Sequence, residues 1–278
     1  MDTTIAITSS KVPEKLGLSE ALNIGVVTTI SSYTTTYSSG AGTENRNGNI
    51  ALCASTINNS ICKSDGGRWS FNETVGDTTP DRGYTEAGAI VGNRYTKSIG
   101  GGVCQVATTV FNAVYDSGFQ VVSRHNHDLH MASYPAGRDA AISYPYLDLI
   151  WQNNESSDVL MQASTTGYSI TVSMLGVNPQ YSVVTEEGQW TNGEHYTTEN
   201  VVDPAKEPNS KATQTSGSDG KSIVIKRKVY DKDGRLVREE EYNSQYKPKT
   251  EIIVFGPGDE ANKMLAEGTA RMKNESDS

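Results

Sequence analysis

A single cysteine, Cys104, lies just after a run of three glycines in the stretch SIGGGVCQVATT. Glycines allow the backbone to turn sharply and to approach a ligand closely. The residues that follow predict a helix, and the first turn of a helix offers unpaired N–H groups and the positive end of the helix dipole. Both features favour a thiolate, and the same N–H groups could bind the oxyanion that forms when a thiolate attacks a carbonyl. The oxyanion candidates are Gln105 and the glycine-turn amides, including Gly101 and Gly102. A buried, unreactive cysteine under a glycine turn is the alternative.

Three of the four histidines of the chain lie within six residues, at positions 125, 127 and 130. A cysteine nucleophile needs a base or cationic partner, and histidine is the usual one. His125 and His127 would share one face of a predicted strand. Asp139 could orient an imidazole, and Arg138 could bind a carboxylate. Surface histidines, an Arg138–Asp139 pair in a turn, or a zinc site that adds Asp128 are the alternatives, although this spacing is weak for zinc.

The two other cysteines, Cys53 and Cys62, are nine residues apart. One close pair and one single cysteine fit a disulfide plus a free thiol in an exported protein. Three unpaired cysteines in a reducing compartment fit equally well. Asn72, in the stretch WSFNETVG, could line a substrate cleft, although such a stretch can also be a strand with Trp69 and Phe71 in the core.

The composition excludes some partners. The 278 residues include 14 tyrosines, are 35% hydrophobic and carry a net charge of −9, which argues against a nucleic-acid partner. No apolar run approaches the roughly 20 residues of a membrane span. The first residues have no visible secretion signal. We therefore expect that any membrane anchor would lie outside this chain.

The residue patterns predict an α+β fold in which the Cys104 helix packs on antiparallel strands, followed by a small all-β module. A helix is expected with Asn49 as its N-cap, and a second from Val103 to near Gly118. Strands are expected at 24–39 and 119–125, and a hairpin is expected around Asp233 and Gly234. The predicted organisation is a lead-in segment at 1–29, a catalytic domain at 30–178, a β module at 179–258 and a helical tail at 259–278.

Several of these stretches together resemble the VanW family in order and spacing. They are NIALCASTIN, WSFNETVG, GYTEAGAIV, GGGVCQVATTVFNAVYDSG, SRHNH, YPAGRDAAI and LDLIWQNN, and they span about 30–176. The combination of GGGVCQ with a later GRDA makes the resemblance specific. Residues from about 195 to 258 are similar to the G-five type of β module that often follows VanW domains in bacterial cell-surface proteins.

The resemblance implies a role in peptidoglycan chemistry, because some VanW members are regarded as L,D-transpeptidases. Cys104 falls on the family's GGGVCQ cysteine, His127 and Arg124 on its R-x-x-H element, and Asp139 on its GRDA aspartate. The family often has serine where this chain has Asp128, which leaves two carboxylates that could orient the histidine. His127 is the preferred base and His125 the second choice.

The expected function is therefore that of an extracytoplasmic cysteine acyltransferase of the bacterial envelope. Cys104 would attack a stem peptide of peptidoglycan, Arg124 or Arg138 would bind the substrate carboxylate, and no cofactor or metal would be needed. Three alternatives remain open. They are an L,D-carboxypeptidase of the same mechanism, a wall-binding scaffold without catalysis, and a zinc hydrolase that uses the histidines.

Overall fold

The computed structural model describes residues 27–91 and 94–274, so most of the predicted lead-in segment lies outside the described residues. Within the described residues, four α-helices combine with sheets that are mostly antiparallel. The predicted α+β class is therefore confirmed.

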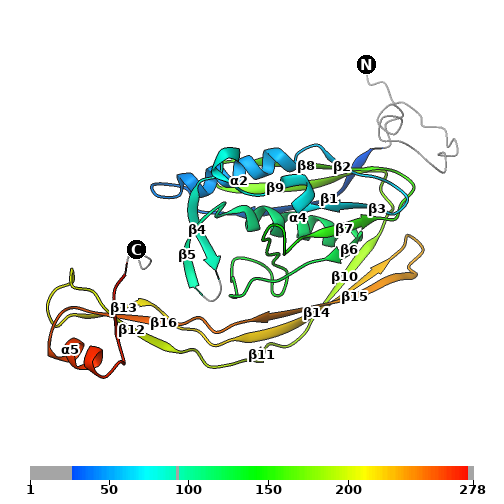
Figure 1. Ribbon diagram of the computed structural model, residues 1–278. Coiled ribbons are helices and arrows are strands. Elements are labelled where there is room, and N and C mark those ends of the chain that lie inside the picture. The colour runs from blue at the N-terminus through cyan, green and yellow to red at the C-terminus, as the bar shows by residue number, and fades with distance from the viewer. Residues whose placement is uncertain (1–26, 92–93, 275–278) are drawn as a thin grey trace, which may run out of the picture.

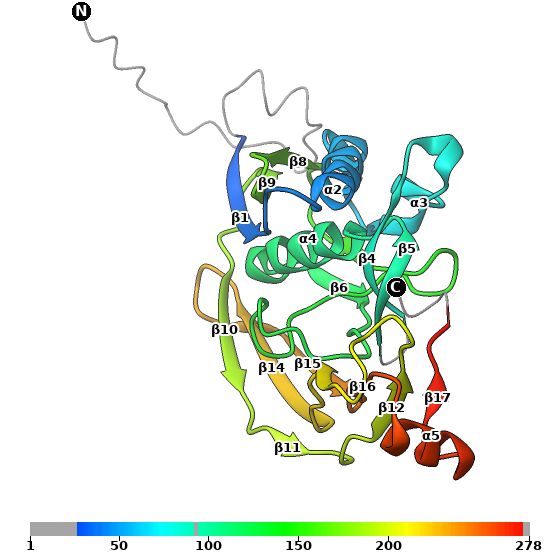
Figure 2. The same ribbon diagram turned by 90° about the vertical axis from the view of Figure 1, so that its left-hand side faces the viewer.

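The N-terminal region, residues 28–176, contains a four-stranded antiparallel sheet in the order β1-β9-β8-β2. Helix α4 packs on β1 and β9, and helix α2 packs beside it on β8 (Figures 1 and 2). The elements are β1 (Thr28–Thr36), α2 (Glu44–Ile57), β2 (Ser60–Cys62), α4 (Val103–Ser117), β8 (Val159–Thr165) and β9 (Ser169–Gly176). Helix α4 carries Cys104 in its first turn.

Helix α4 is the central element of the core. Every residue of the helix is buried except Cys104 and Asp116. It ends at Gly118, whose φ of +83° is readily adopted by glycine, as the sequence predicts. A helix enclosed on nearly all sides holds its first turn firmly, so Cys104 has a fixed position.

Asn49 does not cap helix α2, because the helix begins at Glu44, one turn earlier. Its side chain instead lies buried between α2 and the segment before α4. Asn49 Nδ2 donates to the carbonyls of Thr85 and Gly101, and its Oδ1 accepts from the N–H of Thr85. The asparagine therefore links α2 to the glycine turn.

A second sheet, in the order β3-β7-β6, lies next to the site. Strand β6 ends at Ser123, so the two histidines at 125 and 127 follow it in a loop and do not share a strand face. The short helix α3 follows β3, and the β4–β5 hairpin leads into the glycine turn. The elements are β3 (Gly67–Ser70), α3 (Phe71–Val75), the 3₁₀ helix η1 (Pro80–Arg82), β4 (Glu86–Val91), β5 (Arg94–Ile99), β6 (Gln120–Ser123) and β7 (Ile150–Asn153).

The C-terminal region, residues 182–272, is built around a long hairpin of β14 and β15 that runs beneath α4 (Figure 1). The predicted turn at Asp233 and Gly234 is the turn of this hairpin. The Tyr242 ring packs against Phe111 and Tyr115 of α4 at centroid distances of 5.6 and 5.5 Å. The strands are β10 (Ser182–Glu187), β11 (Thr191–Asn192), β12 (Thr198–Val202), β13 (Lys211–Thr215), β14 (Lys221–Tyr230), β15 (Leu236–Tyr246) and β16 (Glu251–Phe255).

The tail forms helix α5 (Asp259–Ala266) and a short strand, β17 (Arg271–Met272), which pairs in parallel with β12. The end of the chain that the structure describes is therefore part of the C-terminal sheet. Across residues 27–91 and 94–274, no helix is long and apolar enough to cross a membrane.

Candidate functional site

The three glycines before Cys104 form a turn that only glycine fits. Gly100 and Gly102 have φ values of +78° and +109°. A Cβ on Gly101 would lie 2.6 Å from the carbonyl oxygen of Ala87, so a larger residue would collide with the β4 backbone. The turn thus brings the start of α4 against the hairpin that precedes it.

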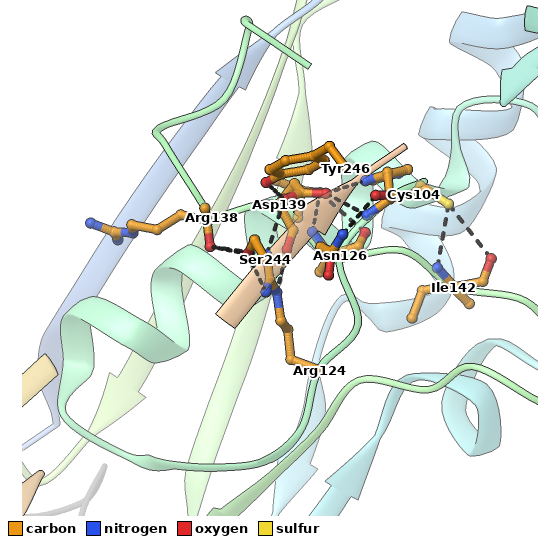
Figure 3. Close-up of polar contacts among 12 residues, drawn as sticks. Cys104, Arg124, Asn126, Arg138, Asp139, Ile142, Ser244 and Tyr246 are labelled. Carbon is orange, nitrogen blue, oxygen red and sulfur yellow. Dashed lines mark hydrogen bonds and ion pairs between the residues drawn. The ribbon is translucent and has the colours of Figure 1, made fainter. Parts of the chain in front are cut away.

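Cys104 lies in the first turn of α4, and its side chain faces the backbone of Ile142 (Figure 3). The Ile142 N–H lies 3.4 Å from the sulfur, and the Ile142 carbonyl lies 3.6 Å from it. The imidazole of His127 also acts on this thiol and favours its ionised form. A thiolate here would accept from the Ile142 N–H and would be stabilised by the positive charge of His127.

His127 connects Cys104 to a buried carboxylate. Its Nδ1 lies 2.6 Å from Asp139 Oδ2, and its backbone N–H donates to the same oxygen at 2.7 Å. Both side chains are almost fully enclosed, at 7% and 3% exposed. Since Nδ1 is engaged with Asp139, Nε2 is the ring nitrogen left for the sulfur. The order Cys104, His127, Asp139 is that of a nucleophile, a base and a group that orients the base.

The pKa shifts of these three groups favour a thiolate–imidazolium pair. Burial opposes ionisation of the Cys104 thiol, but the hydrogen bond and positive charge of His127 outweigh it and lower the pKa of Cys104. Burial also disfavours the charged imidazole, yet the hydrogen bonds to Asp139 and Cys104 raise the pKa of His127 to about 10. Asp139 is buried as well, but His127 and Arg124 lower its pKa to about 2. The shifts of all three groups thus favour their charged forms.

Two residues of strand β15, more than 100 positions along the chain, complete the surroundings of Asp139 (Figure 3). The Tyr246 hydroxyl donates to Asp139 Oδ1 at 2.6 Å. Burial and the charge of Asp139 raise the pKa of Tyr246, so the hydroxyl keeps its proton. Ser244 Oγ accepts from Arg124 Nη1 at 2.9 Å. The C-terminal region thus fixes the carboxylate that orients His127.

The sulfur and the imidazole border a cavity of about 680 Å³. This volume is enough for a small peptide segment. Gly101 and Gly102 line it, together with the start of α4, the β4–β5 hairpin and the loops around 126–134 and 141–147. The further lining residues with ionisable side chains include Arg46, Asp77, Asp128 and Tyr134.

The backbone of the first α4 turn offers one free donor. The N–H groups of Val103 and Gln105 bond to the carbonyls of Gly100 and Gly102, each at 3.0 Å. Between them, the Cys104 N–H has no acceptor within the described part of the chain. This N–H is the donor best placed for the oxyanion that forms on a substrate carbonyl when the sulfur attacks it.

Gln105 does not supply an oxyanion donor with its side chain. Its Nε2 donates to Thr35 Oγ1 at 3.1 Å and to the Thr36 carbonyl at 2.9 Å, so the amide points into the core. Its Oε1 accepts from Arg46 Nη2 at 2.7 Å. Gln105 therefore anchors Arg46, a residue that the sequence analysis did not select.

Neither predicted arginine is available to a substrate. Arg124 is buried and donates to Asp139, Ser244 and the Gly137 carbonyl. Arg138 points away from the cluster, stacks on the Tyr115 ring at 3.9 Å and pairs with Asp116 (Figure 3). Both were expected to hold a substrate carboxylate, but their charges are used within the fold.

Two further predicted residues lie outside the cavity. His125 follows the end of strand β6, is exposed and does not line the cavity. Asn72 is buried and donates to the Leu147 carbonyl, while its N–H donates to Asp148. Asn72 is thus a structural residue of the α3 start.

Cys53 and Cys62 are both free thiols, which agrees with the alternative of unpaired cysteines and not with the candidate disulfide. Cys53 faces the core from α2, and burial raises its pKa. Cys62 lies on β2, where its sulfur donates to the Gly67 carbonyl at 3.3 Å and burial raises its pKa to about 12. Both behave as small apolar core residues, unlike Cys104.

The three clustered histidines do not converge on one point. His127 faces Asp139, whereas the ring of His130 packs edge-on against Trp190 and Tyr246. Within the described residues, no three His, Cys, Asp or Glu side chains are arranged to hold a metal ion.

Residues 45–175 match the family described as VanW like protein, so this part of the chain is a VanW-like domain and the resemblance seen in the motifs is confirmed. The chain is also similar to the "Uncharacterized protein YoaR" of Bacillus subtilis (strain 168), with 36% identity over 131 residues. That alignment covers 47% of this chain and 43% of the relative, so the chain spans less than half of the relative's length.

Two solved structures are similar to part of the chain. The "IgA1 Protease G5 domain structure" is 17% identical, with a TM-score of 0.19, over 30% of this chain and 100% of its own. The "Crystal structure of HP0197-G5" is 14% identical, with a TM-score of 0.15, over 28% and 99%. At these identities and TM-scores, neither match carries an argument about this chain.

Proposed function

We propose that this protein is a cysteine acyltransferase of the bacterial cell envelope, an L,D-transpeptidase that forms 3-3 crosslinks between peptidoglycan stem peptides. The observation that carries the proposal is that the half-buried Cys104 and the buried His127–Asp139 pair lie together at the edge of the 680 Å³ cavity. A structural cysteine needs no ionised partner, whereas this thiol is paired with an imidazolium that a carboxylate orients.

In the first step, the Cys104 thiolate attacks the carbonyl carbon of the third residue of a donor stem. The oxyanion that forms accepts a hydrogen bond from the Cys104 N–H. The amide bond to the terminal D-residue then breaks, and its nitrogen takes the proton from His127 Nε2. The products are a thioester on Cys104, a free D-amino acid and a neutral imidazole.

In the second step, the side-chain amine of another stem attacks the thioester carbonyl. His127 takes the proton from the attacking nitrogen, the carbon–sulfur bond breaks, and the thiolate–imidazolium pair is restored. Water in place of the amine would release a shortened stem, which is the L,D-carboxypeptidase reaction. The chemistry of the site allows both, so the acceptor decides between them.

The assignment of peptidoglycan rests on the VanW-like domain, whose resemblance points to a cell-wall-associated protein outside the cytoplasm. The G-five-type module expected after it would bind or space wall polymer. A wall-binding scaffold without catalysis is the rival function. It predicts that Cys104 reacts slowly until the protein unfolds.

The test is mass spectrometry of the purified protein incubated with disaccharide-tetrapeptide fragments of peptidoglycan. Cys104→Ala removes the proposed nucleophile. Cys62→Ala is the matched control, because it removes a buried thiol whose pKa is raised by burial and not lowered by His127. We expect a dimer that has lost one terminal D-alanine with the wild type and with Cys62→Ala, and no product with Cys104→Ala.

A shortened tripeptide without dimer would identify a carboxypeptidase. If the folded wild type gave neither product nor a thioester adduct on Cys104, the scaffold function would replace the proposal.

A further inference from the structure

The cavity beside Cys104 contains a cation that the fold does not neutralise. Arg46, on helix α2, lines the cavity, and its Nη2 donates to Gln105 Oε1, a neutral acceptor. No carboxylate in residues 27–91 and 94–274 forms an ion pair with Arg46. A guanidinium has five N–H donors, so most of them remain available.

Arg46 lies against the same helical turn as the nucleophile. A Cβ on Gly102 would be only 3.1 Å from Arg46 Cγ, so the stem of the arginine crosses the glycine turn two residues before Cys104. The guanidinium then reaches Gln105, one residue after Cys104. The side chain thus runs from Gly102 to Gln105, and its positive charge lies at Gln105, next to the cavity.

The position of the charge is fixed by the core. Gln105 is buried, and both donors of its amide are used by Thr35 and Thr36 of strand β1, so its Oε1 has one orientation. The same guanidinium acts on Tyr134, where burial raises the pKa of the phenol and the charge of Arg46 opposes it. The Tyr134 ring stacks on His127, with the two ring centroids 6.5 Å apart.

Of the other charged side chains that line the described part of the cavity, Asp77 and Asp128 are carboxylates, and His127 is the one further cation. Asp128 pairs with Lys247 at 2.8 Å, and the imidazolium of His127 is engaged with Asp139. Arg124 and Arg138 are paired within the fold. Among the described residues, Arg46 is therefore the cation of the cavity lining that has no carboxylate partner.

We infer that Arg46 binds the C-terminal carboxylate of the leaving residue, so the site acylates at the last peptide bond of a short peptide and not within a longer one. The inference rests on the proposed acyl transfer. In the first step, the bond from the donor carbonyl to the last residue breaks, and the amine of that residue takes the proton from His127. Its carboxylate stays paired with Arg46 until the free amino acid leaves, and the acyl group remains on Cys104.

The peptide experiment compares a tetrapeptide stem ending in a D-alanine carboxylate with the same stem ending in a carboxamide. Thioester formation on Cys104 is followed by intact-protein mass spectrometry. A charge-assisted hydrogen-bonded pair predicts that the wild type prefers the carboxylate by about 10- to 100-fold. Arg46→Gln should lose that preference through slower reaction of the carboxylate, while the carboxamide rate stays within about twofold.

A second experiment does not depend on peptidoglycan. Iodoacetate carries a carboxylate and iodoacetamide does not, and both alkylate the same sulfur. Arg46→Gln should lower the iodoacetate-to-iodoacetamide rate ratio at Cys104 by about 10-fold. Arg68→Gln is the control, because Arg68 is exposed on strand β3 and does not line the cavity, yet its loss changes the net charge equally.

An unchanged rate ratio in Arg46→Gln would overturn the carboxylate site. Equal rates of thioester formation by the wild type with the carboxylate and the carboxamide peptide would also overturn it. If neither peptide reacts but the rate ratio falls in Arg46→Gln alone, the proposed transpeptidase function fails and the anion-binding site at Arg46 stands.

Discussion

Within the residues that the structure describes, two histidine–aspartate pairs have the same contact and opposite surroundings. His127 Nδ1 lies 2.6 Å from Asp139, and His195 Nδ1 lies 2.6 Å from Asp219. The first pair is 7% and 3% exposed, whereas the second is 75% and 54% exposed. The distance is identical, so the environment decides what each pair can do.

The buried pair is surrounded by donors, and the exposed one is surrounded mainly by water. Asp139 accepts from Arg124, from Tyr246 and twice from His127. Asp219 accepts from His195 and from the N–H of Tyr196. An exposed ion pair is screened and contributes little, while a buried one cannot lose a partner without leaving an uncompensated charge. The burial of the His127–Asp139 pair and the additional donors to Asp139 therefore distinguish it from the exposed pair, whereas the histidine–aspartate contact itself does not.

The largest expected effect is that of Asp139→Asn. The asparagine no longer stabilises the imidazolium, so the Cys104 thiolate loses its partner. We expect acyl transfer to slow by about 100- to 10,000-fold. Because Arg124 would remain buried without its counter-charge, the free energy of unfolding should fall by about 3–5 kcal/mol. Steady-state rates and urea unfolding measure the two effects. A folded variant with the wild-type rate would remove Asp139 from the mechanism.

The pH dependence of Cys104 reactivity follows from the coupled pair. Because His127 lowers the pKa of Cys104, alkylation by iodoacetamide should remain fast well below about pH 8.5, the ordinary thiol value. Acyl transfer also needs a protonated His127, so it should fall as pH rises through about 10. Rates measured from pH 4 to 11, with the urea-unfolded protein as reference, test both limits. An alkylation midpoint near that of the unfolded chain would contradict the ion pair.

The same groups predict how stability changes with pH. The pKa of Asp139 is lowered to about 2 on folding, so its contribution is present above about pH 3.9 and is lost as pH falls through about 2. We expect a loss of about 2–3 kcal/mol from this group over that interval. The raised pKa of His127 gives a contribution that is complete below about pH 6.5 and is lost as pH rises through about 10.

Cys104 acts in the opposite direction on the alkaline side. Its pKa is lowered on folding, so its contribution to stability grows with pH until about 8.5, the value of the unfolded chain. The two effects oppose each other up to that point, and the net loss should begin above it. Urea unfolding at steps of one pH unit gives the curve. A steady decline that begins near pH 6.5 would show that the thiol is not ionised in the folded protein.

The sequence predicted the groups that lie close to one another along the chain. The glycine turn, the helix from Val103 and the end at Gly118 are local features that follow from backbone preferences. Cys104, His127 and Asp139 were selected from residue type, and the motifs resembling the VanW family chose among the alternatives. The structure brings these three together, which supports that selection.

The residues missed by the sequence analysis come from elements that only the tertiary fold brings to the site. Tyr246 reaches Asp139 from more than 100 residues away, and no local pattern shows which tyrosine does so. Arg46 was placed before the expected start of its helix, because Asn49 was interpreted as the cap. Arg138 was selected for its charge, but its guanidinium stacks on the Tyr115 ring within the fold. An earlier helix start would have put Arg46 and Asn49 on neighbouring turns facing the glycines.

Tyr246→Phe tests the donor set around Asp139 with a smaller expected effect. The variant keeps the ring that packs against His130 and Trp190 but loses the hydroxyl that donates to Asp139. We expect acyl transfer to slow by about 3- to 10-fold and the alkylation midpoint of Cys104 to rise, because a less firmly held carboxylate orients His127 less well.

Tyr242→Phe is the matched control on the same strand. Its hydroxyl interacts with Glu240 and Arg227 and not with Asp139. Both variants should lose a similar amount of stability, about 1–2 kcal/mol in urea unfolding. Only Tyr246→Phe should move the alkylation midpoint. Equal midpoints in the two variants would mean that Tyr246 is purely structural.

The smallest effect is expected at the exposed pair. Asp219→Asn removes the same kind of contact as Asp139→Asn, but water can solvate His195 in its place. We expect the melting temperature to stay within about 1 °C of the wild type and the Cys104 alkylation rate to be unchanged. Differential scanning fluorimetry and iodoacetamide kinetics, run beside Asp139→Asn, make the comparison direct. A clear loss of stability in Asp219→Asn would show that the 2.6 Å contact itself, without enclosure, is enough to matter, and the distinction between the two pairs would fail.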